Sequence, residues 1–221
     1  SPPSTPVQNV NDKPTGAPQL AGIAREEEAL VVDKSLIADE DGIGAHSVIW
    51  QRSSTKTDWQ AFPDAVGEIL PLTQSHVGYS YRAVVSYTDG HGTREILVTS
   101  PSETVTNVDD PVEGEVIVTG KPLEGEMLVA STERVFDEDG IASLSIGWEA
   151  SKDGHNWQAI ETASTSRFSL AQNMVGRQVR ARVNVVDTFG VETVIFSQAT
   201  NTVKNVNNKP AGKILVRRVG N

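Results

Sequence analysis

Residues 81–87 read Tyr-Arg-Ala-Val-Val-Ser-Tyr, and residues 179–185 read Val-Arg-Ala-Arg-Val-Asn-Val. In both stretches every second residue is apolar, and the residues between them are mostly polar. This alternation predicts a β-strand that is buried on one face and polar on the other. The two stretches lie 98 positions apart.

The same period of 98 runs through the whole sequence. Asn9-Val10 recurs at 107–108 and again at 205–206, and the DEDGI segment at 39–43 recurs at 137–141. A fixed period of this kind indicates an array of equivalent structural units. We therefore expect an excerpt from a longer series: the tail of a preceding repeat (1–8), two full repeats (9–106 and 107–204), and a linker with the start of a following repeat (205–221).

Each repeat contains short alternating segments separated by Gly, Asp, Asn and Pro, and no stretch keeps a helical period. About seven strands in one repeat predict an all-β fold of two tandem immunoglobulin-like β-sandwich domains. Trp50 and Trp148 fall on the third strand, where such domains bury a tryptophan between their sheets. In the second repeat the further expected strands are 116–118, 127–130, 145–150, 167–170 and 193–197.

Composition limits the possible functions. The net charge is −10, and each repeat carries about twice as many acidic as basic side chains, so binding of nucleic acid is not expected. No apolar run approaches the roughly 20 residues of a membrane span, so no membrane insertion is expected. Cysteine is absent, which excludes disulfides as staples. Acidic clusters suit hard cations, although they also serve solubility alone.

No catalytic arrangement is visible. The histidines at 46, 76, 91 and 155 do not recur in the other repeat, and they are interpreted as surface or loop residues. GxSxG and phosphate-binding glycine loops are absent, and the carboxylates sit in expected loops rather than in a cleft. We expect that the protein is not an enzyme.

The two DxDG segments begin like an EF-hand loop, but the later positions do not fit. An EF-hand needs an oxygen ligand at position 5 and a Glu at position 12. Position 5 is Ile43 or Ile141 here, and position 12 is Trp50 or Trp148. Tight turns built by Asp and Gly remain a simpler explanation for each loop taken alone.

A different arrangement of carboxylates follows from the expected topology. The DxDG loop, the loop after the sixth strand and the segment that enters the domain all lie at the same pole of such a sandwich. Several ionised carboxylates at one pole repel one another and need a counter-charge. Ca²⁺, with 6–8 oxygen ligands, would supply that charge.

These segments resemble a known arrangement. The linker Asn-Val-Asp-Asp-Pro at 107–111, the DxD pair and the later Asp187 resemble the interdomain calcium sites of cadherin-like domains. The rest of the repeat sequence, including "LTQxxVG" and "SYTDGHGT", resembles the tandem repeats of large bacterial RTX-type or biofilm adhesins. The resemblance implies six calcium ligands at the central junction: Asn107, Asp109, Asp110, Asp137, Asp139 and Asp187. It implies further ligands from the turn of the preceding domain at Glu26, Glu27 and Glu28. It implies a matching set, which lacks its upstream domain, at the first junction: Asn9, Asn11, Asp12, Asp39, Asp41 and Asp89.

The resemblance further implies a structural extender of a cell-surface, extracellular adhesin. Ca²⁺ would stiffen the junctions between neighbouring repeats, and a host-surface or biofilm ligand would bind elsewhere in the parent protein. The last linker, 205–210, has no carboxylate, so calcium there is in question. The alternative function is a binding module that recognises carbohydrate or protein through its loops, with Trp59, Trp157 and the loop at His91 as contacts.

Overall fold

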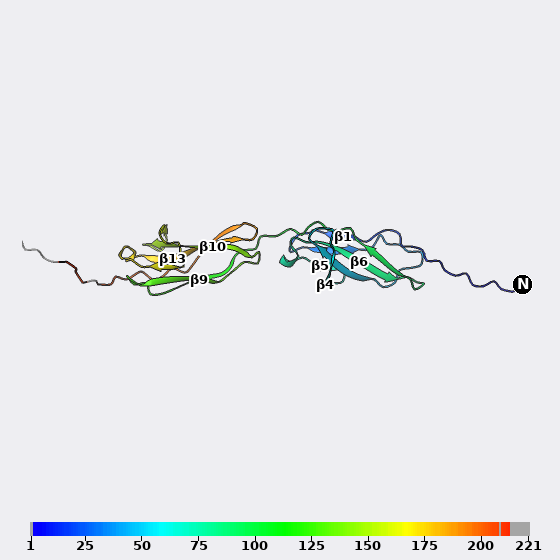
Figure 1. Ribbon diagram of the computed structural model, residues 1–221, viewed down its shortest axis with the longest axis horizontal. Helices are drawn as coiled ribbons and strands as arrows, with labels where there is room; N and C mark the ends of the chain where they lie inside the picture. Colours follow the sequence, from blue (N-terminus) through cyan, green and yellow to red (C-terminus); the bar gives the residue numbers. More distant parts are fainter. Residues whose placement is uncertain (1, 208, 213–221) are drawn as a thin grey trace, which may run out of the picture. The chain divides into compact units, whose positions relative to one another are not determined.

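The chain forms two compact units, Ser1–Val108 and Asp109–Asn221, in a computed structural model that describes residues 2–207 and 209–212. The predicted all-β fold is confirmed: each unit is an antiparallel immunoglobulin-like sandwich of seven strands (Figure 1). The predicted strand of a following repeat at the C-terminus falls largely on residues 213–221, outside the described residues. No helix in the described part of the chain is both long and apolar enough to cross a membrane.

The first unit has a three-stranded and a four-stranded sheet, in the orders β1-β2-β5 and β4-β3-β6-β7. A short 3-10 helix, η1 (Gln74–His76), precedes β6. The strands are β1 (Gln19–Gly22), β2 (Ala29–Asp33), β3 (Ser47–Ser53), β4 (Gln60–Val66), β5 (Ile69–Pro71), β6 (Ser80–Thr88) and β7 (Arg94–Val98).

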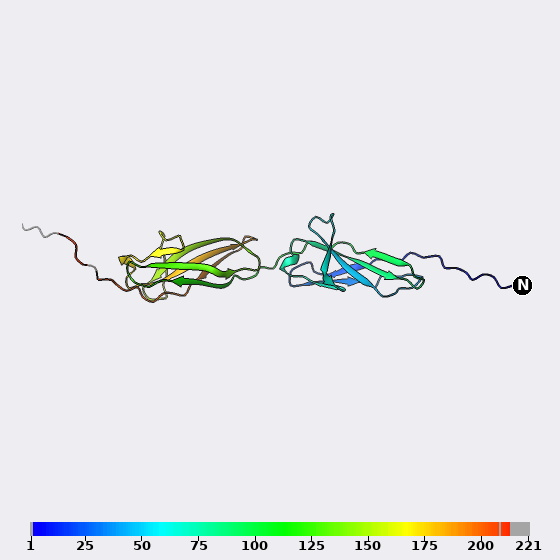
Figure 2. The same cartoon turned by 60° about the horizontal axis from the view of Figure 1, so that its bottom comes forward.

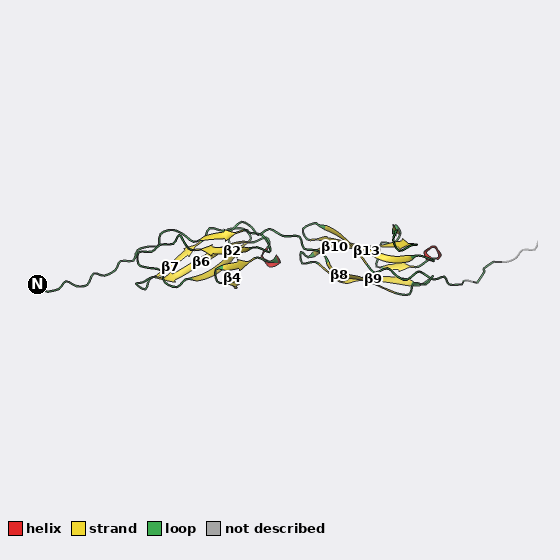
Figure 3. Cartoon of the chain, turned by 180° about the vertical axis from the view of Figure 1, so that it is seen from behind, coloured by secondary structure: helices red, strands yellow, loops and turns green. Residues whose placement is uncertain are grey.

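The second unit repeats this topology, with sheets β12-β9-β8 and β11-β10-β13-β14 (Figure 2). Its 3-10 helix, η2 (Gln172–Met174), stands at the same place before the sixth strand (red in Figure 3). The strands are β8 (Glu113–Thr119), β9 (Met127–Phe136), β10 (Ile141–Ser151), β11 (Gln158–Ala159), β12 (Arg167–Ser169), β13 (Gln178–Asp187) and β14 (Glu192–Phe196).

The two tryptophans on the third strands form the centre of each core. Trp50 is fully buried and Trp148 is 1% exposed. Their indole N–H groups donate to backbone oxygens, Trp50 to Gly67 at 2.9 Å and Trp148 to Thr165 at 2.8 Å. A buried indole needs such an acceptor, and the same bond in both units ties the segment between the fourth and fifth strands to the core.

Strand register brings the acidic loops together within each unit. Ile141, directly after the DxDG turn, pairs with Asp187 at the end of β13. In the first unit, the backbone N–H of Gly90 donates to the backbone oxygen of Asp41 at 2.9 Å. This bond joins the two equivalent loops to each other. We call this end of each unit, where the chain enters, the entrance pole.

Candidate metal centre

The entrance pole of the second unit gathers three carboxylates from three segments. Asp109 comes from the entering chain, Asp139 from the turn between β9 and β10, and Asp187 from the end of β13. An oxygen of each lies within 4.8 Å of the others. Asp139 and Asp187 are 3% and 4% exposed, whereas Asp109 is exposed.

The backbone holds these side chains in place. Asp139 Oδ2 accepts the N–H of Asp110 at 2.9 Å, and the N–H of Asp139 donates to Asp137 Oδ1 at 2.9 Å. Asp187 Oδ1 accepts two backbone N–H groups, from Phe189 at 2.7 Å and from Val191 at 2.8 Å. The carboxylates of Asp139 and Asp187 are therefore held by backbone hydrogen bonds before any ligand arrives.

One oxygen at this pole has no partner. Asp139 Oδ1 is buried and accepts no hydrogen bond from any described residue. A buried carboxylate oxygen left in this state costs more free energy than a neutral group would. A cation bound to it would remove that cost.

Electrostatics points the same way. Burial raises the pKa of Asp137, and the nearby charges of Asp139, Asp187 and Asp109 raise it further, against the lowering effect of the Asp139 N–H. The ion pairs described for the second unit, Arg134–Glu115 and Arg180–Glu149 with Arg182 nearby, involve none of these aspartates. The cluster therefore holds negative charge without a protein counter-charge, and its all-oxygen donor set fits a hard divalent cation such as Ca²⁺.

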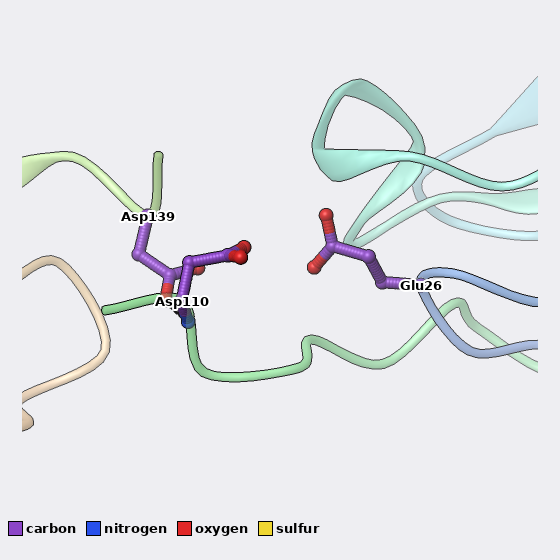
Figure 4. Close-up of side chains that lie close together, drawn as sticks. All are labelled: Glu26, Asp110 and Asp139. Carbon is purple, nitrogen blue, oxygen red and sulfur yellow. Dashed lines mark hydrogen bonds between the residues drawn. The ribbon is translucent and has the colours of Figure 1, made fainter. Parts of the chain in front are cut away.

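Asp110 has a double role in the second unit. Besides its N–H bond to Asp139, its carboxylate has an oxygen within 4.8 Å of an Asp139 oxygen, and Figure 4 shows the two side chains together. Four of the six residues predicted for the central junction, Asp109, Asp110, Asp139 and Asp187, thus meet at this pole. Asp137 acts through the Asp139 N–H and the charge that it adds.

The entrance pole of the first unit keeps the framework but not the cluster. The N–H of Asp12 donates to Asp41 Oδ2 at 2.7 Å, and Asp89 Oδ1 accepts the N–H groups of His91 and Thr93 at 2.8 Å each. Among residues 2–108, however, no three acidic or histidine side chains come as close as the trio of the second unit. Asn9 and Asn11 are exposed, and the Asn11 amide donates to Glu95 at 3.1 Å.

This difference begins with Asn11, which stands where the second unit has Asp109. Two further side chains, whose contacts at this pole the sequence reasoning did not predict, add to it. The Tyr87 hydroxyl donates to Asp39 Oδ2 at 2.6 Å, and the His91 ring Nε2 lies 3.9 Å from Asp41 Oδ1. Their counterparts 98 residues later are Val185 and Phe189, which offer neither a donor nor a charge. The signal was therefore present in the sequence as two polar residues that do not recur.

The opposite end of each unit, where the chain leaves, is the exit pole. There the structure separates the three predicted glutamates of the first unit. Glu26, labelled in Figure 4, is 3% exposed. Its Oε2 accepts the N–H of Val108 at 3.2 Å. Glu27 is exposed, and Glu28 pairs with Arg25 at 3.0 Å on the surface. Sequence reasoning missed Glu124, which lies 98 residues after Glu26 and accepts the N–H of Val206 at 3.0 Å.

The tryptophans considered as sugar platforms are covered on one face. The Arg82 guanidinium lies 4.5 Å from the centre of the Trp59 ring, and that of Arg180 lies 4.3 Å from the Trp157 ring. The interpretation of the histidines as surface or loop residues is wrong for His76. It is 8% exposed, and its Nδ1 accepts the Thr73 N–H at 3.0 Å.

No protein-family model matches the sequence, and no curated protein matches it. Among solved structures, the FN1–FN3 domains of chicken CNTN1 are 14% identical over 87% of this chain and 68% of theirs, with a TM-score of 0.31. Domains A168–A170 of titin are 13% identical over 86% of this chain and 62% of theirs, with a TM-score of 0.32. A Ca²⁺-stabilised adhesin with which an Antarctic bacterium binds ice is 11% identical over 92% of this chain and 52% of that one, with a TM-score of 0.32.

Proposed function

We propose that this chain is a structural extender of a large surface adhesin, in which Ca²⁺ at a junction between repeats restricts the hinge. The observation that carries the proposal is the trio of Asp109, Asp139 and Asp187, with its buried and unpartnered Asp139 oxygen. The trio stands at the pole where the linker enters, so an ion held there also holds the linker.

The linker connects this trio to a second set of oxygens. Asn107 and Val108 end the first unit, and Val108 binds Glu26 through its N–H. Asp109, a proposed ligand of the ion, and Asp110, whose N–H donates to Asp139, follow directly in the sequence. An ion bound by Asp109 together with Asp139 and Asp187 would fix the start of the linker to the second unit, which gives it a means of restricting the junction. Removing the ion would leave repelling carboxylates and a freer hinge.

The proposed role is structural rather than catalytic, and it places the protein outside the cell, at its surface. Neighbouring repeats of the same chain would be its partners. The rival function, recognition of sugars through Trp59 and Trp157, gains no support, because an arginine already stacks on each ring.

Isothermal titration of the 221-residue chain with Ca²⁺ tests the proposal. Asp139→Asn should weaken the tightest site at least about 10-fold, because it removes a charge from the centre of the trio. The matched change Asp41→Asn in the first unit should alter this affinity little, because Asp41 belongs to no such trio. Absence of Ca²⁺ binding by the wild-type chain, or equal affinity in Asp139→Asn, would refute the proposed site.

A further inference from the structure

The corner between β5 and β6 lies at the exit pole of the first unit and contains the short helix η1. The N–H of Glu27 donates to the oxygen of Leu72 at 3.0 Å, at the start of this corner. The N–H of Gly78 donates to the oxygen of Val105 at 3.0 Å, at its end. The corner therefore joins the turn after β1 to the segment through which the chain leaves the unit.

His76, the third residue of η1, accepts a hydrogen bond that holds this corner together. Its Nδ1 accepts the N–H of Thr73 at 3.0 Å, and the Thr73 hydroxyl lies 3.0 Å from the same atom. In a capping box, a Glu or Gln at this position accepts that N–H. A histidine can do so only while Nδ1 carries no proton, because both ring nitrogens of the charged form are donors.

The surroundings of the ring disfavour a positive charge on it. His76 is 8% exposed, and its centroid lies 5.4 Å from that of Phe62 on β4 and 5.4 Å from that of Tyr81 on β6. Burial lowers the pKa of His76, and the positive charge of Arg52, on β3, lowers it further. Tyr81 cannot offset that charge by ionising, since burial raises its pKa to about 12.

The equivalent corner of the second unit keeps the framework and replaces the histidine. Met174, which does not titrate, stands where the first unit has His76, and it is also 8% exposed. The N–H of Gly176 donates to the oxygen of Val203 at 3.0 Å, as Gly78 does to Val105. The chain thus contains its own control for the role of His76.

We propose that His76 makes the exit corner of the first unit an acid-sensitive switch, whereas the equivalent corner at Met174 does not respond to acid. Protonation of the ring leaves the Thr73 N–H without its acceptor and adds a second positive charge near Arg52. The unfolded chain binds this proton with a pKa of about 6.5, and the folded unit resists it. The stability that neutral His76 provides is therefore present above that pH and is lost as the pH falls towards the lower folded pKa. This switch goes beyond the proposed function and does not need Ca²⁺.

Hydrogen–deuterium exchange of the 221-residue chain in excess chelator tests the proposal, at pH 7.5 and at pH 5.5. Rates are corrected for the intrinsic effect of pH on amide exchange. The opening equilibrium of the corner at 72–79 should rise about 3- to 10-fold on acidification, because a histidine kept neutral by the fold costs up to a factor of about 10 per pH unit below its unfolded pKa. The corner at 170–177 should change less than about twofold. His76→Gln keeps an acceptor for the Thr73 N–H and should remove the acid response at 72–79.

Two results would overturn the inference. One is an acid response at 72–79 that is the same in His76→Gln as in the wild-type chain. The other is a His76 ring that titrates at or above a pH of about 6.5 by NMR, because its pKa would then not be lowered by the fold. The NMR titration uses the wild-type chain, so it decides the matter even where His76→Gln folds poorly. Since chelator removes Ca²⁺, neither result bears on the proposed function.

Discussion

The Tyr87 hydroxyl donates a 2.6 Å hydrogen bond to Asp39 Oδ2 at the entrance pole of the first unit. Burial raises the pKa of Tyr87 well above its usual value, and the hydrogen bond to Asp39 raises it further, so the phenol stays protonated and keeps donating. Val185 stands at the equivalent position of the second unit. The first pole therefore gives its first DxD aspartate a side-chain hydroxyl donor, and the equivalent position of the second pole offers none.

Removing this donor should destabilise the first unit. Tyr87→Phe keeps the ring that packs against His46 but leaves Asp39 without its hydroxyl partner. Because a hydrogen bond to a charged acceptor is worth more than a neutral one, we expect a loss of about 1–3 kcal/mol in the free energy of unfolding. Urea denaturation in the presence of chelator measures it. Unchanged stability would mean that water replaces the phenol without cost.

The turn at the exit pole of the first unit contains a strained residue. Glu27 has a φ of 65°, in the left-handed region, whereas the equivalent residue in the second unit is Gly125, with a φ of 82°. Glu27→Gly should raise the free energy of unfolding by about 1 kcal/mol, because glycine adopts this conformation without a Cβ penalty. The reverse change, Gly125→Ala, should lower it by a similar amount. Thermal unfolding checks both, and a destabilised Glu27→Gly would contradict the account.

Arg180 stacks between two rings on the four-stranded sheet of the second unit. Its guanidinium lies 4.3 Å from the Trp157 centroid and 3.9 Å from that of Phe196, and it donates twice to Glu149, at 2.8 and 2.9 Å. Lysine cannot reproduce both the planar stacking and the paired donors. Arg180→Lys should therefore cost about 1–2 kcal/mol of unfolding free energy.

The matched change for that prediction is Arg82→Lys in the first unit. Within residues 2–207 and 209–212, Arg82 lies over one ring, that of Trp59, and it donates to the neutral Gln51. Its replacement should cost less than that of Arg180. Equal losses in urea denaturation would show that the second ring and the carboxylate of Glu149 contribute nothing.

The loop after β10 makes stability depend on pH at the acid end. Backbone and side-chain hydrogen bonds from Asn156, then from His155 and Ser151, hold the pKa of Asp153 well below its usual range. A carboxyl with a lowered folded pKa contributes stability that is fully present above its unfolded pKa of about 3.9 and is lost as the pH falls through the folded pKa. Carboxyl NMR titration should find Asp153 ionised well below pH 3.8. Thr55 occupies this position in the first unit, so that loop should show no such titration.

Some of these features follow from local sequence, and others depend on what packs nearby. The strand alternation at 81–87 and the recurring tryptophans predicted the sandwich, because period-2 burial and turn residues are local properties. The convergence of Asp109, Asp139 and Asp187 follows from the topology once the sandwich is assumed. The role of Tyr87 could not be predicted in this way, because it depends on which side chain reaches Asp39. The different environments of Glu26 and Glu28 could not be predicted for the same reason. Glu26 is buried and accepts the N–H of Val108 at the end of the first unit, whereas Glu28 lies on the surface.

Small-angle X-ray scattering of the 221-residue chain, recorded with millimolar Ca²⁺ and then with excess chelator, tests the central claim most directly. If Ca²⁺ restricts the junction, the wild-type profile should change on chelation towards that of a more flexible particle. Asp139→Asn should already give the flexible profile in Ca²⁺ and should respond little to chelator. Superimposable wild-type profiles in Ca²⁺ and in chelator would contradict the calcium-stiffened extender.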